Sequence, residues 1–155
     1  MPLLIEQPGG RCAGTVNDSL VSHIDILPTM LELADTDRPP ILEGESLVPL
    51  LHGEVDLERQ VMMEFNRYEI EHDSWGGFQP VRSLISAQYK LVINLLHTDE
   101  LYDLGNDPAE VENRIDDPEL ADTRDRLHDA LLDWMYGKRD PFRGPAWERR
   151  PWRQS

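Results

Sequence analysis

A chain of 155 residues is long enough to form one domain with a hydrophobic core, or part of a larger one. Its net charge of −15 argues against nucleic acid as a partner, because such a charge repels the phosphate backbone. No apolar run approaches the roughly 20 residues of a membrane span. The first residues also lack a signal-peptide pattern, so we expect a cytoplasmic protein without a membrane partner.

The charge is unevenly distributed along the chain. From Lys138 onward there are six basic and two acidic side chains, a net charge of +4, so residues 1–137 carry −19. A basic segment of this kind can bind a polyanion, but here it can also bind the acidic residues of its own chain. We expect residues 138–155 to be an extended basic tail that docks intramolecularly.

The first third of the chain predicts short elements of an α/β domain. Residues 2–5 and 20–24 are short apolar runs, which predict a buried strand and a second short strand. A strand so near residue 1 has no partner before it, which suggests neighbours upstream of this chain. Asp25 then predicts the N-cap of a helix that ends near Ala34, with Pro28 tolerated in its first turn.

The middle and the end of the chain predict a small sheet covered by a helix. Alternating apolar and polar residues predict strands at 61–66, 80–86, 89–95 and 100–104, and four strands in succession favour an antiparallel sheet. A helix follows, with Asp117 as its N-cap, Pro118 at its first position and Gly137 after its end. Its apolar face predicts that it covers the sheet.

Between this sheet and this helix, residues 98–113 read TDELYDLGNDPAEVEN. Gly105 and Asn106 predict a turn after the last strand. Asp107, Pro108 and Glu110 have the order of a capped helix start. Their spacing does not have the order of a calcium-binding loop, so turn and capping roles explain these polar residues better.

The richest collection of polar and aromatic residues is the segment 66–79, NRYEIEHDSWGGFQ, which is longer than most hairpin loops. Three interpretations compete with that of a plain surface loop. Glu69, Glu71, His72 and Asp73 could bind a metal, although their spacing fits no standard site. His72 and Asp73 could act as acid and base. We favour a substrate-binding role at a pocket rim, in which His72, Arg67 and Trp75 contact the ligand.

The remaining reactive side chains have simpler explanations. Cys12 is the one cysteine and lies in a Gly-rich context without a neighbouring base, so we expect an unreactive thiol. Ser46 lacks the second glycine of a nucleophile elbow and is better explained by capping or loop hydrogen bonds. The other histidines are expected to be structural (His23, His52, His97 and His128).

Three stretches occur in an order that resembles type I sulfatases: SHIDILPT at 22–29, GESLVPLL at 44–51 and ELYDLGNDPAEVEN at 100–113. The last is the most specific, and the chain looks like a bacterial branch of that family. The resemblance implies an alkaline-phosphatase-like α/β fold that becomes α+β at its C-terminus. This chain would supply the last strand and helix of the large domain (residues 1–56), the small four-stranded subdomain (57–137) and the basic tail (138–155).

The resemblance also implies a chemistry, hydrolysis of a sulfate ester by a formylglycine with a divalent metal, usually calcium. Cys12 is followed by Ala-Gly-Thr, whereas the family forms formylglycine in a C/S-x-P-x-R motif. No catalytic and no metal residue can therefore be assigned in this chain. We expect a C-terminal fragment that is inactive alone and needs a missing N-terminal catalytic portion to act on a sulfated small molecule or glycan.

Two alternatives stay open. One is a related phosphodiesterase or phosphonate monoester hydrolase, which shares the general features of this half. The other is a free-standing acidic binding module without catalysis.

Overall fold

The computed structural model describes residues 3–7, 9–10, 12–53, 59–67 and 79–153. The chain divides into two units, residues 1–59 and 60–155, each of which is described by itself. Among the described residues, no helix has the length and apolar character that crossing a membrane requires.

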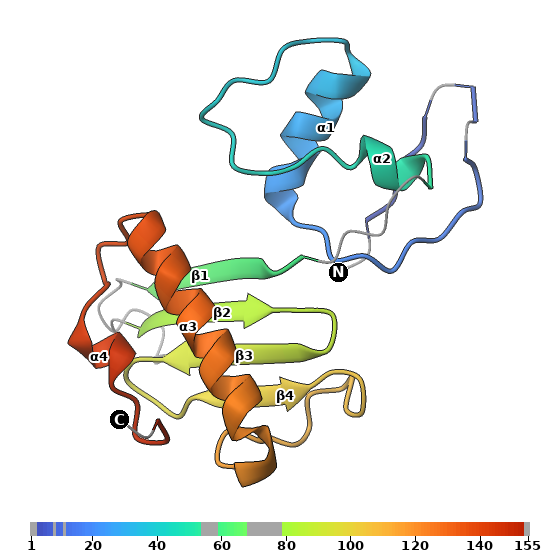
Figure 1. The fold of residues 1–155 in the computed structure, drawn as a ribbon. Helices are drawn as coiled ribbons and strands as arrows, with labels where there is room; N and C mark the ends of the chain where they lie inside the picture. Colours follow the sequence, from blue (N-terminus) through green and yellow to red (C-terminus); the bar gives the residue numbers. More distant parts are fainter. Residues whose placement is uncertain (1–2, 8, 11, 54–58, 68–78, 154–155) are drawn as a thin grey trace. The chain divides into compact units, whose positions relative to one another are not determined.

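Residues 60–155 are built on a four-stranded sheet, so the predicted strands are confirmed (Figure 1). The strands are β1 (Val61–Arg67), β2 (Gln79–Ile85), β3 (Tyr89–Asn94) and β4 (Glu100–Asp103). They pair antiparallel in the order β1-β2-β3-β4. The register places Met62, Leu84, Leu91 and Leu101 side by side in one row, which supplies one apolar face of the sheet.

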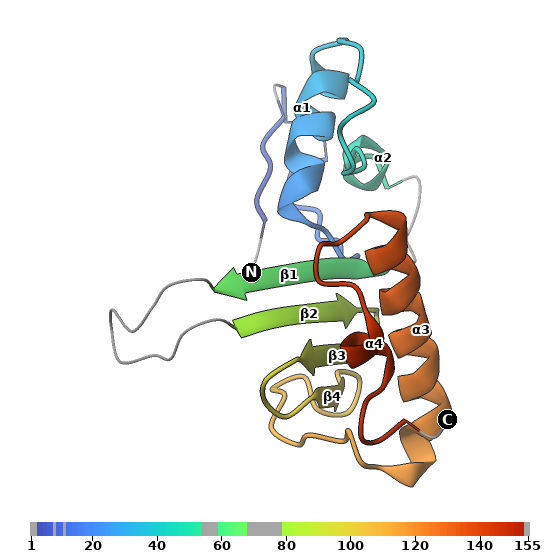
Figure 2. The same ribbon diagram turned by 90° about the vertical axis from the view of Figure 1, so that its left-hand side faces the viewer.

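The helix α3 (Ala121–Gly137) covers that face, as predicted (Figure 2). A single 3-10 turn, Pro118–Leu120, precedes it, and the Asp117 carboxylate accepts a hydrogen bond from the amide of Glu119. Asp117 therefore acts as the predicted cap, with Pro118 at the first position where no amide donor is needed. The helix includes Gly137 as its last residue, whereas the sequence predicted that the helix would end before Gly137.

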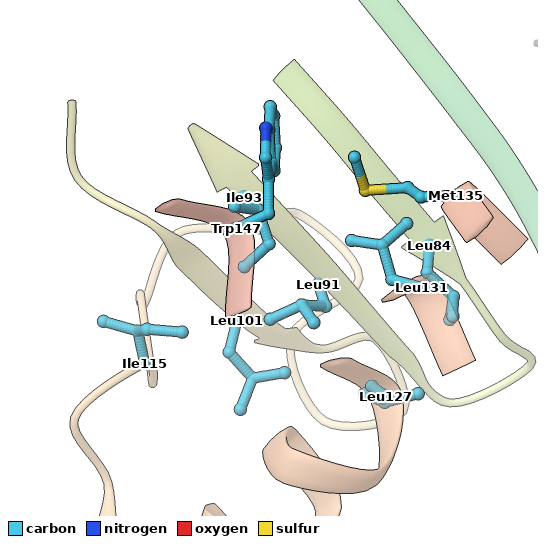
Figure 3. Packing of buried hydrophobic residues seen from close by; sticks show 9 residues of the cluster. All are labelled: Leu84, Leu91, Ile93, Leu101, Ile115, Leu127, Leu131, Met135 and Trp147. Carbon is cyan, nitrogen blue, oxygen red and sulfur yellow. The ribbon is translucent and has the colours of Figure 1, made fainter. Parts of the chain in front are cut away.

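The hydrophobic core lies between α3 and the sheet (Figure 3). Leu84, Leu91 and Ile93 of the sheet meet Leu131 and Met135 of the helix, and all five side chains are fully buried. Leu101, Ile115, Leu127 and Trp147 complete the cluster. Burying a side chain of this size contributes roughly 1.5–3 kcal/mol, so this cluster is the main source of stability for residues 60–155.

The tail docks on its own chain, as predicted, but it is not extended. It forms the short helix α4 (Pro145–Glu148), and the Trp147 side chain is only 1% exposed within the core cluster. Arg150 forms an ion pair with Asp99, and Arg153 forms one with Asp129. The expectation of an extended segment was wrong because Trp147 is apolar enough to enter the core and Pro145 starts a helical turn around it.

Residues 1–59 contain the helices α1 (Ile26–Leu33) and α2 (Val48–Leu51), so the predicted helix after Asp25 is confirmed. The two predicted strands are wrong. Residues 3–5 are irregular and Leu4 is 94% exposed, since no other described residue of 1–59 forms a strand with which they could pair. Residues 23–25 form a 3-10 turn, because the Asp25 carboxylate accepts the amide hydrogen of Ser22 and closes the chain on itself.

Candidate functional site

The three residues predicted to contact a ligand lie at the end of β1 and beyond it. Arg67 is the last residue of β1, and its backbone lies opposite Gln79 of β2. His72, Trp75 and the Arg67 side chain lie outside what the structure describes, and so do the other candidate residues Glu69, Glu71 and Asp73. What the structure does describe is the base of this segment, where β1 ends and β2 begins.

Arg82 of β2 is the central residue of that base. Its side chain is fully buried and donates two hydrogen bonds to Asp140, from Nε to Oδ2 at 2.6 Å and from Nη2 to Oδ1 at 3.0 Å. This paired geometry matches the planar guanidinium to the carboxylate, and it is the strongest type of protein ion pair. Arg82 therefore joins the sheet to the residues that follow α3.

The same guanidinium also reaches the end of β1. Its Nη1 donates to Oδ1 of Asn66 at 2.8 Å, and Asn66 lies opposite Pro80 in the sheet. The rings of Phe142 and Trp147 lie 5.4 and 5.7 Å from the guanidinium carbon, within the range of cation–π contacts. Arg82 thus holds together the last strand residues before the 68–78 segment, the first strand residues after it and the tail.

The electrostatics of this cluster favour the charged form of Asp140. Burial alone would raise its pKa, but the hydrogen bonds from Arg82 and from the Phe142 amide outweigh burial and hold the pKa of Asp140 below its ordinary value. Glu64 lies 3.8 Å from Arg82 and is 57% exposed, so it adds little. Asp140 therefore remains ionised at neutral pH, and its negative charge balances the positive charge of the buried Arg82 guanidinium.

The sequence prediction of the site did not include Arg82. The alternation of the strand does indicate that Arg82 faces the core, since Arg82 lies on the same face of β2 as Pro80 and Leu84, which are buried. An arginine in a core-facing row requires an acidic partner. That partner, Asp140, lies 58 residues away, and no local pattern in the sequence connects the two.

The residues after β4 form turns that are held by side-chain hydrogen bonds. The Asp103 carboxylate accepts hydrogen bonds from the amides of Gly105 and Asn106 and from the Asn106 side chain. The predicted helix start at Asp107 is wrong, because residues 107–110 form a turn in which Glu110 has a φ of 55°. The Asp107 carboxylate instead accepts the amides of Val111 and Glu112, four and five residues later, whereas a helix N-cap accepts the amides two or three residues later.

Asn113, the last residue of this stretch, ties it to the sheet. Its Oδ1 accepts hydrogen bonds from the amides of Leu101 and Ile115, at 3.0 and 3.1 Å. Its Nδ2 donates to the backbone oxygen of Asp99 at 3.0 Å. One side chain therefore satisfies three backbone groups beside the edge strand β4, which gives this asparagine a structural role.

Two other stretches singled out in the sequence contact each other within residues 1–59. The Asp25 carboxylate is fully buried, accepts the amides of Ser22 and Glu45, and forms an ion pair with Arg59. The Thr29 hydroxyl donates to the backbone oxygen of Asp25 and accepts the amide of Leu47. The stretches 22–29 and 44–51 are therefore two halves of one hydrogen-bonded structure.

Of the two roles expected for Ser46, the structure shows a loop hydrogen bond, because its Oγ accepts the amide of Val48 at 3.2 Å, while the residue that caps α2 is Leu47. The placement of His128 differs from expectation. The helical pattern places it away from the apolar face of α3, yet its side chain is fully buried beneath Trp147 and Trp152 of the tail. The tail covers a second face of α3 that its own periodicity does not reveal.

Comparison with known proteins identifies what this structure is part of. The family model described as "N-sulphoglucosamine sulphohydrolase, C-terminal" matches residues 1–136. The chain belongs to this sulfatase family. It corresponds to the C-terminal region of sulfatases with the alkaline-phosphatase-like fold, as the three sequence stretches implied.

Individual sulfatases agree with this assignment. An uncharacterised sulfatase of Escherichia coli K12, YidJ, is 53% identical over 99% of this chain and 30% of its own length. A solved 2-O GAG sulfatase is 30% identical and superimposes with a TM-score of 0.66, over 76% of this chain and 25% of the other. This chain thus spans less than a third of the length of either relative.

The fold alone is shared more widely. The solved phosphonate monoester hydrolase of Agrobacterium radiobacter is 24% identical, with a TM-score of 0.65 over 82% of this chain and 27% of the other. At this identity the likeness shows a common architecture only.

The described residues do not fit the groups with which sulfatases act. Cys12 is exposed and is followed by Ala-Gly-Thr, so it does not lie in the motif in which formylglycine forms. In the part of the chain that the structure describes, no three acidic, histidine or cysteine side chains lie close enough together to hold a metal ion. We therefore derive no catalytic step from these residues.

Proposed function

We propose that this chain forms the C-terminal part of a sulfatase that hydrolyses a sulfate ester, and that it contributes the rim of the substrate pocket instead of the catalytic centre. The observation that carries the proposal is the cluster built around Arg82, at the strand ends that flank a long polar and aromatic segment in the sequence. Loops that bind ligands commonly stand on a rigid scaffold of this kind. Membership of the sulfatase family supplies the reaction class.

In this proposal Arg67, His72 and Trp75 contact the substrate. An arginine pairs well with a sulfate, because both present several hydrogen-bonding groups in a fixed geometry. A tryptophan offers a flat apolar surface to a sugar or another ring, and a histidine can donate to a ring substituent. The substrate class is a sulfated glycan or small molecule, in line with the family description and with the GAG-specific relative.

The catalytic formylglycine and the divalent metal, usually calcium, belong in this proposal to an N-terminal catalytic portion. The isolated 155-residue chain is therefore inactive. An assay of the isolated chain with 4-nitrophenyl sulfate and sulfated glucosamines, with and without calcium, should show no turnover above background. Turnover by the isolated chain would contradict this division of roles.

The rim role is tested in a chimera in which this chain replaces the matching 30% of the E. coli relative. The unaltered relative first identifies which sulfated compound of the panel it hydrolyses. In the chimera, Arg67→Ala, His72→Ala and Trp75→Ala should each lower kcat/KM about tenfold or more, the loss expected for one contact worth about 1.4 kcal/mol.

The matched control is Arg126→Ala, which removes an exposed arginine on α3 whose hydrogen bond to Thr123 is long, at 3.5 Å. This variant should retain the activity of the chimera. If all three rim variants also stay within twofold of the chimera, the segment does not contact substrate.

A further inference from the structure

The end of the tail runs beside α3 (Figure 2). His128 of α3 contacts this part of the tail. Its ring is fully buried and lies edge-on to Trp152, with 5.1 Å between the ring centroids. On one side Nε2 is 2.7 Å from the backbone oxygen of Trp147, and on the other Nδ1 is 2.6 Å from Nη1 of Arg153. Both ring nitrogens are thus in contact with the tail.

These two partners define the protonation state of the ring. A backbone oxygen can only accept a hydrogen bond, so Nε2 must carry the hydrogen. A guanidinium can only donate, so Nδ1 must be the acceptor and carry none. The arrangement requires a neutral imidazole. A second proton on Nδ1 would face an N–H of Arg153 and place a buried cation in contact with the Arg153 guanidinium.

We propose that His128 is a pH-sensitive latch for the tail: its protonation at mildly acidic pH displaces Arg153 and releases residues 147–153 from α3. The latch consists of His128, Trp147, Trp152 and Arg153. It does not depend on the proposed enzymatic function, because it rests on the contacts between the tail and α3 alone.

Five charged groups lie around His128 and Trp152. Arg153 faces His128 directly and also binds Asp129 of α3, whose side chain is 59% exposed. Arg124 of α3 lies over the Trp152 ring, 4.6 Å from its centroid. Asp99, before β4, accepts the Trp152 indole hydrogen and binds Arg150. The two carboxylates would favour a histidine cation, but each is already paired with an arginine.

The balance of these groups opposes a cation at this position. Burial of the ring is the main effect that lowers the pKa of His128 below its ordinary value of about 6.5, and the charge of Arg153 adds to it. In the released state the ring is solvated and regains its ordinary affinity for a proton. The released population should therefore rise as pH falls below about 6.5, by at most about tenfold for each pH unit because one proton is bound.

The experiment follows the Trp152 indole hydrogen by NMR between pH 8 and pH 5 in the full chain. Its hydrogen bond to Asp99, at 2.8 Å, exists only while the tail is docked. After correction for the intrinsic pH dependence, protection of this hydrogen from exchange should fall by up to tenfold per pH unit below about 6.5. A Trp152→Phe variant assigns the signal among the four tryptophans.

The decisive variant is His128→Gln. The Gln amide can donate to the Trp147 oxygen and accept from Arg153, as the neutral ring does, but it cannot bind a proton. Its Trp152 protection should lose the pH dependence below about 6.5 that comes from the histidine, and any change that remains comes from carboxylates. His97→Gln is the matched control, since His97 is exposed near a turn, and it should titrate like the unaltered chain.

If His128→Gln retains the full pH dependence, the latch proposal is wrong. If this variant fails to dock its tail, the ¹⁵N chemical shifts of the His128 ring in the unaltered chain provide the test instead. A neutral Nε2–H tautomer that persists below pH 6 while docked, with Trp152 protection falling, supports the latch. A docked His128 that becomes a cation near pH 6.5 without loss of Trp152 protection overturns it.

Discussion

Arg82 and Asp140 form a buried ion pair that joins the second strand of the sheet to the residues after its covering helix, 58 positions later in the chain. Through Arg82, the pair links the described strand ends on either side of residues 68–78 to Asp140 of the tail. The stability of the tail and the geometry of the candidate site should therefore depend on each other.

Loss of either partner of this pair should destabilise the chain strongly. Arg82→Leu leaves the Asp140 carboxylate buried without its cation, and Asp140→Asn leaves the Arg82 guanidinium in the same position. Breaking a buried pair typically costs about 3–5 kcal/mol in the free energy of unfolding. Urea unfolding followed by tryptophan fluorescence measures the loss, since all four tryptophans lie in residues 60–155.

Glu64→Gln is the matched control for this pair. Glu64 also lies near Arg82, at 3.8 Å, but it is 57% exposed. Its substitution should change the free energy of unfolding by less than about 0.5 kcal/mol. A loss of 3 kcal/mol in this control, or a loss below 1 kcal/mol in both pair variants, would show that the pair is not the source of stability.

Asn113 should resist even conservative replacement. Asn113→Asp keeps an acceptor for the amides of Leu101 and Ile115 but cannot donate to the Asp99 backbone oxygen, and it places a negative charge beside that oxygen. Asn113→Ala leaves all three backbone groups without their partner. We expect losses of roughly 1–3 kcal/mol for Asp and about 3 kcal/mol for Ala in the same urea assay.

Asn106→Ala is the comparison for Asn113, because it removes one side-chain hydrogen bond in an exposed turn. It should cost roughly 0.5–1.5 kcal/mol, the usual net value of a single bond. Equal losses at the two positions would mean that Asn113 has no special bridging role.

Much of this fold could be predicted from local patterns in the sequence, and the failures have a common physical cause. The strands 61–66 and 89–95 and the helix after Asp117 follow from side-chain alternation and capping, which depend on neighbouring residues alone. Leu4 was predicted to be buried in a strand, but a strand forms only where another segment supplies backbone partners. The buried state of His128 likewise depends on a tail 19 residues away.

The candidate site was predictable to a smaller extent. The length and composition of segment 66–79 drew attention to Arg67, His72 and Trp75, and their roles stay predictions. The base beneath the segment depends on Arg82 and on its partner after α3, and a contact across 58 residues has no local signature. The resemblance to sulfatases could be recognised in the sequence because the stretches 22–29, 44–51 and 100–113 contain turns and caps, which need specific residue types.

Gly44 should tolerate no side chain. A Cβ at this position would lie 2.0 Å from the backbone oxygen of Ile24 and 2.8 Å from the amide nitrogen of Asp25. Gly44→Ala must therefore move the loop away from Asp25, which costs more than about 2 kcal/mol within residues 1–59. Amide NMR signals of Asp25 and Leu47 should shift or broaden, while tryptophan fluorescence of residues 60–155 should not change.

Gly137→Ala is the matched substitution for Gly44. Nothing lies within 4 Å of a Cβ at Gly137, the last residue of α3, and alanine is the better helix former. It should be neutral or should stabilise residues 60–155 by up to about 1 kcal/mol. Unchanged Asp25 and Leu47 signals in Gly44→Ala would refute the close approach on which the prediction depends.

The buried Asp25 should make residues 1–59 sensitive to acid. Burial alone would raise its pKa, but the Arg59 side chain and the amides of Glu45 and Ser22 donate hydrogen bonds that hold the pKa of Asp25 below its ordinary value. A carboxyl whose pKa is lowered by folding stabilises the folded state above its unfolded pKa of about 3.8, and this contribution is lost as pH falls through the folded value.

The sign of the effect can be checked with Asp25→Asn. At pH 7 this variant should be destabilised by several kcal/mol, because the half-buried Arg59 cation loses the charge of its fully buried partner. On acidification, the unaltered chain should lose the native amide signals of residues 22–29 below about pH 4, whereas any folded Asp25→Asn should lose little further stability over the same range. Asp35→Asn, at an exposed carboxyl after α1, provides the control and should follow the unaltered chain. If Asp25→Asn unfolds with the same acid dependence as the unaltered chain, a different carboxyl controls the acid stability of this unit.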